Sequence, residues 1–134
     1  MSRKSKGINA ERELISLFWN KGWASIRVAG SGSMKYPSAD ILASNRLRKL
    51  AIECKSSKNK SKYLTKKEVE DLKTFAELFG AEPWIAVRFD RTDWLFVSIN
   101  DLKDTGQNLL ISLEMAKKKG LLFEEIINQV IIKE

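Results

Sequence analysis

The chain contains no histidine and only one cysteine among its 134 residues. Without histidine it cannot build a Ser-His-Asp triad or a Cys-His pair, and it lacks the ligand cluster of most zinc sites. Its single cysteine, Cys54, cannot form a disulfide within the chain, which argues against an oxidising compartment. The catalytic groups that remain are carboxylates, lysine, arginine and hydroxyls, with any hard metal ion that the carboxylates bind.

Long apolar runs are also missing from the sequence. No stretch approaches the roughly 20 apolar residues of a membrane-spanning helix. The basic segment 1–6 is not followed by the apolar stretch of a secretory signal. We therefore expect a cytoplasmic protein without a membrane partner. Its length is that of one domain of roughly 100–200 residues, so we expect a single domain over residues 1–134.

Acidic residues are scarce in the first half of the chain. Residues 1–62 hold 14 basic and 4 acidic side chains, residues 63–134 hold 10 basic and 13 acidic ones, and the formal net charge is +7. This asymmetry indicates a polyanionic partner that contacts mainly the first half. Nucleic acid is the commonest such partner, because neutralising its phosphates supplies much of the binding free energy. An anionic membrane surface is the alternative.

Hydrophobic periodicity predicts an α/β fold. Helical spacing with a stop at Gly22 predicts a first helix over 8–22, and a capping-box pattern at 65–68 predicts the start of a second helix that ends at Gly80. Alternation and turn residues predict strands over 23–28, 38–44, 47–55, 84–89 and 94–99, loops over 29–33 and 56–62, and a short final helix over 123–130. This order predicts a mixed five-stranded sheet with helices on both sides.

The strand that ends at Lys55 carries an acid in an otherwise apolar run. Side chains alternate between the two faces of a strand, so Glu53 and Lys55 share one face while Ile52 and Cys54 share the other. A carboxylate within such a run is unusual for a buried strand and marks this face as a candidate functional surface.

Asp40 lies on the preceding strand, which we expect to form a hairpin turning at Asn45 and Arg46. If the loop has two residues, Asp40 lies diagonal to Glu53; if it has four, Asp40 faces Glu53 directly. Both registers bring Asp40, Glu53 and Lys55 to one face within cross-strand reach, whereas a loop of odd length separates them.

Two carboxylates that converge repel each other unless a cation lies between them. Oxygen ligands suit a hard ion such as Mg²⁺, for which Mn²⁺ can substitute. A neighbouring lysine can orient an attacking water or offset the charge that develops during phosphoryl transfer. Asp40, Glu53 and Lys55 therefore predict phosphodiester cleavage without histidine. The alternative is that Glu53 and Lys55 form a weak, solvated salt bridge on an exposed sheet face.

Glu11 lies on the buried stripe of the first predicted helix, at helical spacing from Leu14 and Phe18. A carboxylate at a core-facing position needs a partner, and a metal site between this helix and the sheet would supply one. The alternative is that Glu11 lies at the frayed end of the stripe and pairs with Arg12 or Arg27.

Four short motifs occur in order along the chain: GINAERELI at 7–15, GWASIR with AGS at 22–31, SADI at 38–41 and IECK at 52–55. Together they resemble the archaeal Holliday junction resolvases, and they match the acid-(x)n-acid-x-lysine core of the restriction-enzyme-like nuclease superfamily. The resemblance covers roughly residues 4–100. Each motif is weak alone, whereas four in order at family-like spacing are specific.

The resemblance implies a restriction-endonuclease-like fold and a homodimer that binds four-way junction DNA. It also implies paired Mg²⁺-dependent nicks that leave 5′-phosphate ends during recombination and repair, with no small-molecule substrate. By this likeness Glu11, Asp40 and Glu53 are metal ligands or adjacent acids, the backbone carbonyl of Cys54 completes the metal shell, and Lys55 positions or activates the attacking water.

The same likeness assigns residues around the phosphate. Arg12 and Arg27 match basic positions near the scissile phosphate, and Ser31 and Ser33 lie in a loop that the family uses near the junction, with Ser31 a candidate catalytic residue. Arg88 falls where a family member can carry lysine.

The basic run after the predicted hairpin contains Lys58, Lys60 and Lys62. We expect these side chains to follow a DNA backbone as point charges; the alternative is a solvated loop. Two other functions remain open from the sequence: a different DNA repair or restriction nuclease of the same superfamily, and a non-catalytic DNA-binding module. The apolar hairpin of residues 84–89 and 94–99, with Val69, Leu72 and Phe75, is a candidate dimer interface.

Overall fold

The computed structural model describes residues 3–30 and 35–129. Its elements in chain order are α1 (Arg3–Asn20), β1 (Ala24–Arg27), β2 (Ile41–Ser44), β3 (Lys49–Ser57), β4 (Ser61–Thr65), α2 (Lys66–Phe79), β5 (Glu82–Phe89), β6 (Leu95–Ser98), the 3-10 turn η2 (Ile99–Asp101), β7 (Lys103–Asp104), β8 (Asn108–Ser112), α3 (Leu113–Lys119), β9 (Leu121–Leu122) and α4 (Phe123–Asn128).

Six strands form the main sheet in the order β1-β2-β3-β5-β6-β9. All neighbouring pairs are antiparallel except the central pair, in which β3 runs parallel to β5 from Leu50–Glu82 to Ser57–Phe89. The fold is therefore α/β with a mixed sheet, as the sequence predicts. The short strand β9 makes the sheet one strand wider than the five expected.

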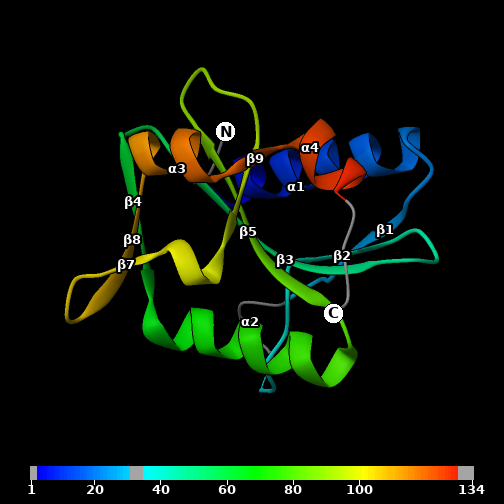
Figure 1. Ribbon diagram of the computed structural model, residues 1–134, viewed down its shortest axis with the longest axis horizontal. Coiled ribbons are helices and arrows are strands. Elements are labelled where there is room, and N and C mark those ends of the chain that lie inside the picture. Colours follow the sequence, from blue (N-terminus) through cyan, green and yellow to red (C-terminus); the bar gives the residue numbers. More distant parts are fainter. Residues whose placement is uncertain (1–2, 31–34, 130–134) are drawn as a thin grey trace.

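Helices cover both faces of this sheet, with α2 on one side and α1 and α4 on the other (Figure 1). Alternate residues of β3 divide between the two layers: Ala51 packs with Leu72 and Val69 beneath α2, whereas Leu50 and Ile52 pack with the residues of α1. The parallel strand β5 is buried on both faces, which is typical of a central strand with helices on each side.

The first helix begins at Arg3, five residues before its predicted start. The polar segment that precedes the apolar stripe continues the helix, because lysine and arginine have good helix propensity and no proline interrupts them. The helix ends where expected: Gly22 takes a left-handed conformation with φ +81°, and the Trp23 N–H donates to the Phe18 carbonyl oxygen at 3.0 Å.

The β2–β3 hairpin has a four-residue loop. Ser44 pairs with Lys49 across the loop, and Ile41 pairs with Ile52 at the other end of the hairpin. The Asn45 Oδ1 accepts hydrogen bonds from two backbone N–H groups of the loop, at 3.1 and 3.0 Å. Extending this register by one residue places Asp40 opposite Glu53. A four-residue loop is one of the two loop lengths predicted to bring these acids together.

The segment 56–62 is not a loop, contrary to the prediction. The strand β3 continues to Ser57, and Ser61 begins β4 after a short turn. Periodicity did not reveal β4 because its sequence, Ser-Lys-Tyr-Leu-Thr, shows no alternation of apolar and polar residues and buries only Leu64. Its partner is β8, which lies between residues 100 and 122, where the sequence predicts no element. Together β4, β8 and β7 form a second three-stranded sheet.

The second helix begins at Thr65, as predicted. The Thr65 hydroxyl accepts a hydrogen bond from the Glu68 N–H at 3.0 Å, and Gly80 ends the helix in a left-handed conformation with φ +76°. At the other end of the chain, α4 covers Phe123–Asn128 and agrees with the predicted final helix within the described residues. No helix among the described residues is long and apolar enough to span a membrane.

The β5–β6 hairpin forms as predicted, with Trp84 opposite Ser98 and Val87 opposite Leu95. Its suggested role as a dimer interface is wrong for most of its residues, because Ile85, Ala86 and Val87 are buried within the chain itself. Val69 and Leu72, two of the α2 residues predicted to join that interface, are buried too.

Candidate active site

The main sheet opens beside the middle of β3. The strand β3 pairs with β5 as far as Ser57 but with β2 only as far as Ile52. Beyond that point Asp40 borders the edge of β3: its N–H donates to the Ile52 carbonyl oxygen at 2.9 Å, and its Oδ2 accepts the Cys54 N–H at 2.8 Å. The opening thus fixes the Asp40 carboxylate against the strand that carries Glu53 and Lys55.

The Cys54 carbonyl group points to the same opening. Along a strand, the N–H and C=O of one residue point toward the same neighbouring strand. Because the Cys54 N–H points to Asp40, its carbonyl oxygen is directed toward this edge as well.

Glu11 reaches the opening from α1. One carboxylate oxygen each from Glu11 and Asp40 and the Cys54 Sγ lie within 4.8 Å of one another. Burial raises the pKa of Glu11, and the charge of Asp40 adds to this rise, whereas Arg27 opposes it. The Arg27 Nη1 lies 3.5 Å from the Glu11 Oε2, so the pairing with Arg27 and the approach to Asp40 are both present.

Glu53 lies on the other side of Asp40. Burial raises the pKa of Glu53 to about 9, helped by a hydrogen bond to Asp40 and by the Asp40 charge, whereas Lys55 lowers it. Without a cation Glu53 therefore keeps its proton at neutral pH. The side chains of Glu53 and Lys55 are only 17% and 22% exposed, so they are not the solvated surface pair that the alternative interpretation requires.

Lys55 is flanked by two carboxylates. Its Nζ lies 3.9 Å from the Glu53 Oε2 and 2.8 Å from the Glu68 Oε2 on α2. Burial alone lowers the pKa of Lys55, but the hydrogen bond to Glu68 and the charges of Glu53, Glu68 and Asp40 outweigh it, and the net pKa is raised. The lysine is therefore an ammonium ion at neutral pH.

The donor set at the opening fits a hard divalent cation. Glu11, Asp40 and Glu53 offer carboxylate oxygens. Burial first and the neighbouring Asp40 second raise the pKa values of both glutamates, and a cation at this place would offset both effects. The Cys54 thiol does not compete, because burial raises its pKa well above the ordinary value and the thiolate is the form that binds metal. The described residues can therefore hold a metal ion through oxygen atoms.

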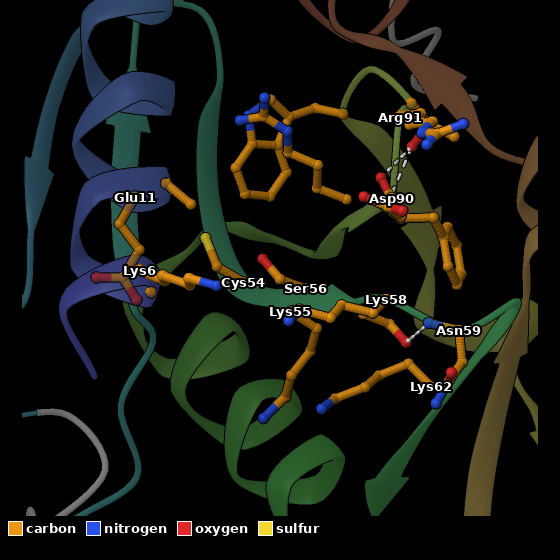
Figure 2. Close-up of a pocket in the computed structure, with 17 residues that line it drawn as sticks. Lys6, Glu11, Cys54, Lys55, Ser56, Lys58, Asn59, Lys62, Asp90 and Arg91 are labelled. Atoms are coloured by element: carbon orange, nitrogen blue, oxygen red, sulfur yellow. Dashed lines mark hydrogen bonds between the residues drawn. The ribbon is translucent and has the colours of Figure 1, made fainter. Parts of the chain in front are cut away.

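A groove of about 990 Å³ leads away from these residues. Figure 2 shows Lys6 and Glu11 on one wall and Asp90 and Arg91 on the opposite wall. Cys54, Lys55 and Ser56 of β3, and Lys58 just after it, lie along the floor between them. Basic side chains outnumber acidic ones around the groove: its basic residues are Lys6, Lys55, Lys58, Lys62, Arg88 and Arg91. A polyanion is the partner that such a groove suits.

The structure gathers some of the predicted DNA-binding residues and separates others. Lys58 and Lys62 line the groove, whereas Lys60 is exposed in the β3–β4 turn. Arg12 is exposed on α1, and Arg27 pairs with Glu11.

Two further predicted positions need comment. Ser31 and Ser33 lie outside the described residues. Arg88 lines the groove, but its Nη1 pairs with Glu13 at 2.6 Å and its guanidinium lies over the ring of Trp94.

Sequence reasoning missed Glu68, Lys6 and Arg91 as neighbours of the site. The capping-box pattern did single out Glu68, but it indicated a helix start and gave no sign of the Lys55 contact. Arg91 takes a left-handed conformation with φ 61° in the β5–β6 turn, which no local pattern indicated.

A mixed sheet that opens at two acids, with a lysine two residues after the second acid, is the arrangement of the restriction-enzyme-like nucleases. A family model described as archaeal Holliday junction resolvase (Hjc) matches residues 2–133. The chain belongs to this family, which confirms the resemblance and the expectation of a Holliday junction resolvase-type endodeoxyribonuclease.

Individual relatives agree with the family model. The chain is 43% identical to crossover junction endodeoxyribonuclease Hjc of Archaeoglobus fulgidus over 129 residues, covering 91% of this chain and 95% of that protein. It is 35% identical to the Hjc of Methanocaldococcus jannaschii over 124 residues, covering 92% and 88%. A solved structure of the A. fulgidus Hjc superposes with a TM-score of 0.84 at 40% identity, over 89% of this chain and 96% of that one.

Proposed function

We propose that this chain is a Mg²⁺-dependent endodeoxyribonuclease, one nuclease domain over residues 1–134, that resolves four-way DNA junctions by paired nicks. The observation that carries this proposal is the position of Asp40 at the sheet opening: it lies close to Glu11 and Cys54 on one side and contacts Glu53, which has the Lys55 ammonium beside it. Family membership supplies the substrate class.

The metal ion would be held by Asp40 and Glu53, with Glu11 and the Cys54 carbonyl oxygen completing its surroundings. Mg²⁺ suits these hard oxygen donors, and Mn²⁺ can replace it. When bound, the ion acts as a Lewis acid that stabilises negative charge on the phosphate and favours ionisation of a nearby water.

Lys55 would supply the second positive charge at the reacting phosphate. Its ammonium donates hydrogen bonds that orient the attacking water and offset charge on the non-bridging oxygens. The water oxygen forms a bond to phosphorus and loses one proton to solvent. The bond from phosphorus to the 3′ oxygen breaks, and that oxygen takes up a proton from solvent, so the protons balance. The products are a 5′-phosphate and a 3′-hydroxyl.

The groove would carry the DNA backbone past the metal site. Lys58 and Lys62 lie on the groove beyond Lys55 and would contact phosphates along the strand. Such contacts position the strand without reading its sequence, as expected for an enzyme that selects a junction by shape. Arg12, Lys60, Ser31 and Ser33 remain candidates for contacts outside the groove, and Ser31 remains a candidate at the reacting phosphate.

A homodimer would supply two equivalent sites at a fixed separation, which symmetric nicks require. The exposed apolar face of α2 is the surface that we propose for the second copy. Leu78 and Phe79 are 86% and 46% exposed, and the Phe79 ring stacks on Phe75 at 5.2 Å between centroids. Large exposed apolar side chains gathered on one helix favour a protein interface.

The catalytic part of the proposal is tested with Asp40→Asn and Lys55→Ala. Asp40→Asn should abolish nicking, and Lys55→Ala should slow it by about 100-fold or more, because the first removes a metal ligand and the second the ammonium. The junction dissociation constant of each variant, measured in Ca²⁺, should stay within about twofold of the parental value. If either variant nicked at the parental rate, the role assigned to the substituted residue would be refuted.

The dimer face is tested with Leu78→Glu, which places a charge on the proposed interface. Sedimentation should show a dimer for the parent and a monomer for the variant, and paired nicks should become single nicks. Glu77→Gln, on an exposed position of the same helix, serves as the control and should remain dimeric. A variant that still sediments as a dimer would exclude this face.

A further inference from the structure

Glu68 lies outside the acid-acid-lysine pattern, yet its carboxylate is nearer to the Lys55 ammonium than that of Glu53. The Lys55 Nζ lies 2.8 Å from the Glu68 Oε2 and 3.9 Å from the Glu53 Oε2. The Glu68 side chain is 35% exposed and that of Lys55 is 22% exposed. Solvent and salt screen such a partly buried pair less than a surface pair, so this contact has a substantial effect on where the ammonium rests.

The backbone of Glu68 is held in the first turn of α2. Its N–H is hydrogen-bonded to the Thr65 hydroxyl in the first turn of α2. The next residue, Val69, is buried in the core beneath α2 together with Leu72. The strand β4, which leads into this turn, is paired along its whole length with β8. Lys55 thus meets a carboxylate that is fixed to the helix over the sheet.

Without Glu68 the ammonium would have a different partner. A lysine side chain has a flexible four-carbon stem and considerable rotamer freedom. The next carboxylate to which Lys55 is paired among the described residues is that of Glu53, at 3.9 Å and two residues away on the same face of β3. A direct ion pair there would take up the Glu53 oxygens that a metal ion needs and would turn the ammonium away from the phosphate.

We propose that Glu68 is a positioning residue of the reaction: it holds the Lys55 ammonium beside the reacting phosphate and keeps the Glu53 carboxylate available for the metal ion. This inference rests on the proposed function, because it acts through Lys55 and Glu53. Glu68 itself contacts neither substrate nor metal.

The first test compares Glu68→Gln with Glu70→Gln, which removes the same charge from an exposed position of the same helix. Glu68→Gln should lower the single-turnover nicking rate at saturating junction and Mg²⁺ by about 10- to 100-fold, the cost of a misplaced catalytic group. The junction dissociation constant and the midpoint of thermal unfolding should stay at the parental values. Glu68→Asp, which keeps the charge, should recover part of the rate, and Glu70→Gln should nick at the parental rate.

A double-mutant cycle with Lys55→Ala then identifies the route of the effect. If Glu68 acts through Lys55, Glu68→Gln should cause no further loss in the Lys55→Ala background. Additive losses would show an independent role for Glu68 and would overturn the inference.

A third measurement needs no metal. Relaxation of the Lys55 ¹³Cε group, assigned by its loss in Lys55→Ala, should show a more mobile side chain in Glu68→Gln and an unchanged one in Glu70→Gln. An unchanged Lys55 side chain in Glu68→Gln would overturn the inference even if the rate fell.

The two levels of the proposal fail differently. If Lys55→Ala nicks at the parental rate, the role of Lys55 in the proposed function is wrong. If Lys55→Ala is slow but Glu68→Gln is not, only the role of Glu68 is wrong.

Discussion

At the scale of single residues, the most unusual group is the Glu53 carboxyl. Burial, and then its contact with Asp40, raise its pKa to about 9, although Lys55 opposes the shift. A protein that kept this acid only for stability would do better with an apolar residue. The burial is consistent with a site that is completed by a cation.

The Glu53 pKa predicts how the metal-free protein responds to pH. Below about 4.5, the ordinary value, Glu53 is protonated in both the folded and the unfolded chain. Between that pH and about 9 the unfolded chain loses the proton while the folded chain keeps it, so the contribution of Glu53 to the free energy of unfolding falls as pH rises.

Glu53→Gln, which mimics the protonated form, should therefore unfold at a higher temperature than the parent near pH 8 in EDTA. The difference should shrink toward pH 5, and Mg²⁺ should raise the midpoint of the parent but not of the variant. Thermal unfolding at several pH values, with EDTA or Mg²⁺, measures these midpoints. If the midpoint of the variant relative to the parent were lower at pH 8 than at pH 5, the raised pKa of Glu53 would be contradicted.

The sequence identified Asp40, Glu53 and Lys55 because strand alternation and a hairpin of even length suffice to bring them together. It could not identify Glu68, because the contact with Lys55 joins a helix to the strand beneath it. Only the packing angle of α2 over the sheet brings these two side chains to 2.8 Å.

At the scale of elements, the end of α4 is tied to the β2–β3 hairpin by Arg48. Its side chain is 7% exposed and makes two bonds of 2.9 Å to the Glu82 carboxylate. Its Nη1 donates to the carbonyl oxygens of Ile126 and Gln129 at 2.6 and 3.2 Å, and its guanidinium lies over the Trp23 ring. One side chain thus joins the hairpin, β5 and α4.

Arg48→Ala should lower the free energy of unfolding by about 3–5 kcal/mol, because it leaves the Glu82 carboxylate and helix carbonyl groups without their partner. Arg48→Lys should recover little, since an ammonium cannot reproduce the bidentate contact. Urea unfolding measures both variants. The nicking rate of the folded protein at low temperature should be unchanged, and a loss below about 1 kcal/mol would contradict the account.

The sequence predicted those elements whose periodicity is apolar and missed those that depend on distant partners. The helix α2 and the β5–β6 hairpin follow from their own apolar stripes. The strand β4 has only Leu64 buried, and it is a strand because β8, more than 40 residues later, pairs with it.

At the scale of the whole molecule, the excess of basic residues in the first half becomes one side of a groove. Lys6, Lys55, Lys58 and Lys62 all come from residues 1–62 and line it together with Arg88 and Arg91. The same half holds only four acids, and three of them form the proposed metal site. Acidic side chains are therefore few where phosphate approaches, and a cation would neutralise most of those present.

Junction binding should weaken steeply with salt, because each phosphate contact releases counterions. The salt dependence is the slope of the logarithm of the junction association constant against the logarithm of the salt concentration. Lys58→Ala and Lys62→Ala should each make this slope less steep by about 1 for each groove that engages the DNA. Lys118→Ala, in the last turn of α3 and outside the groove, should leave the slope unchanged. Equal slopes for all three variants would mean that the groove does not carry the backbone.

The central claim is a metal-dependent, junction-selective nuclease site built on Asp40, Glu53 and Lys55. Its most direct measurement is the nicking of a four-way junction and of a linear duplex of the same sequence, with Mg²⁺ or EDTA, by the parent and by Asp40→Asn. We predict paired nicks in the junction with Mg²⁺ only, far slower cutting of the duplex, and no nicking by the variant. Equal cutting of the duplex, nicking in EDTA, or an active Asp40→Asn would contradict the account.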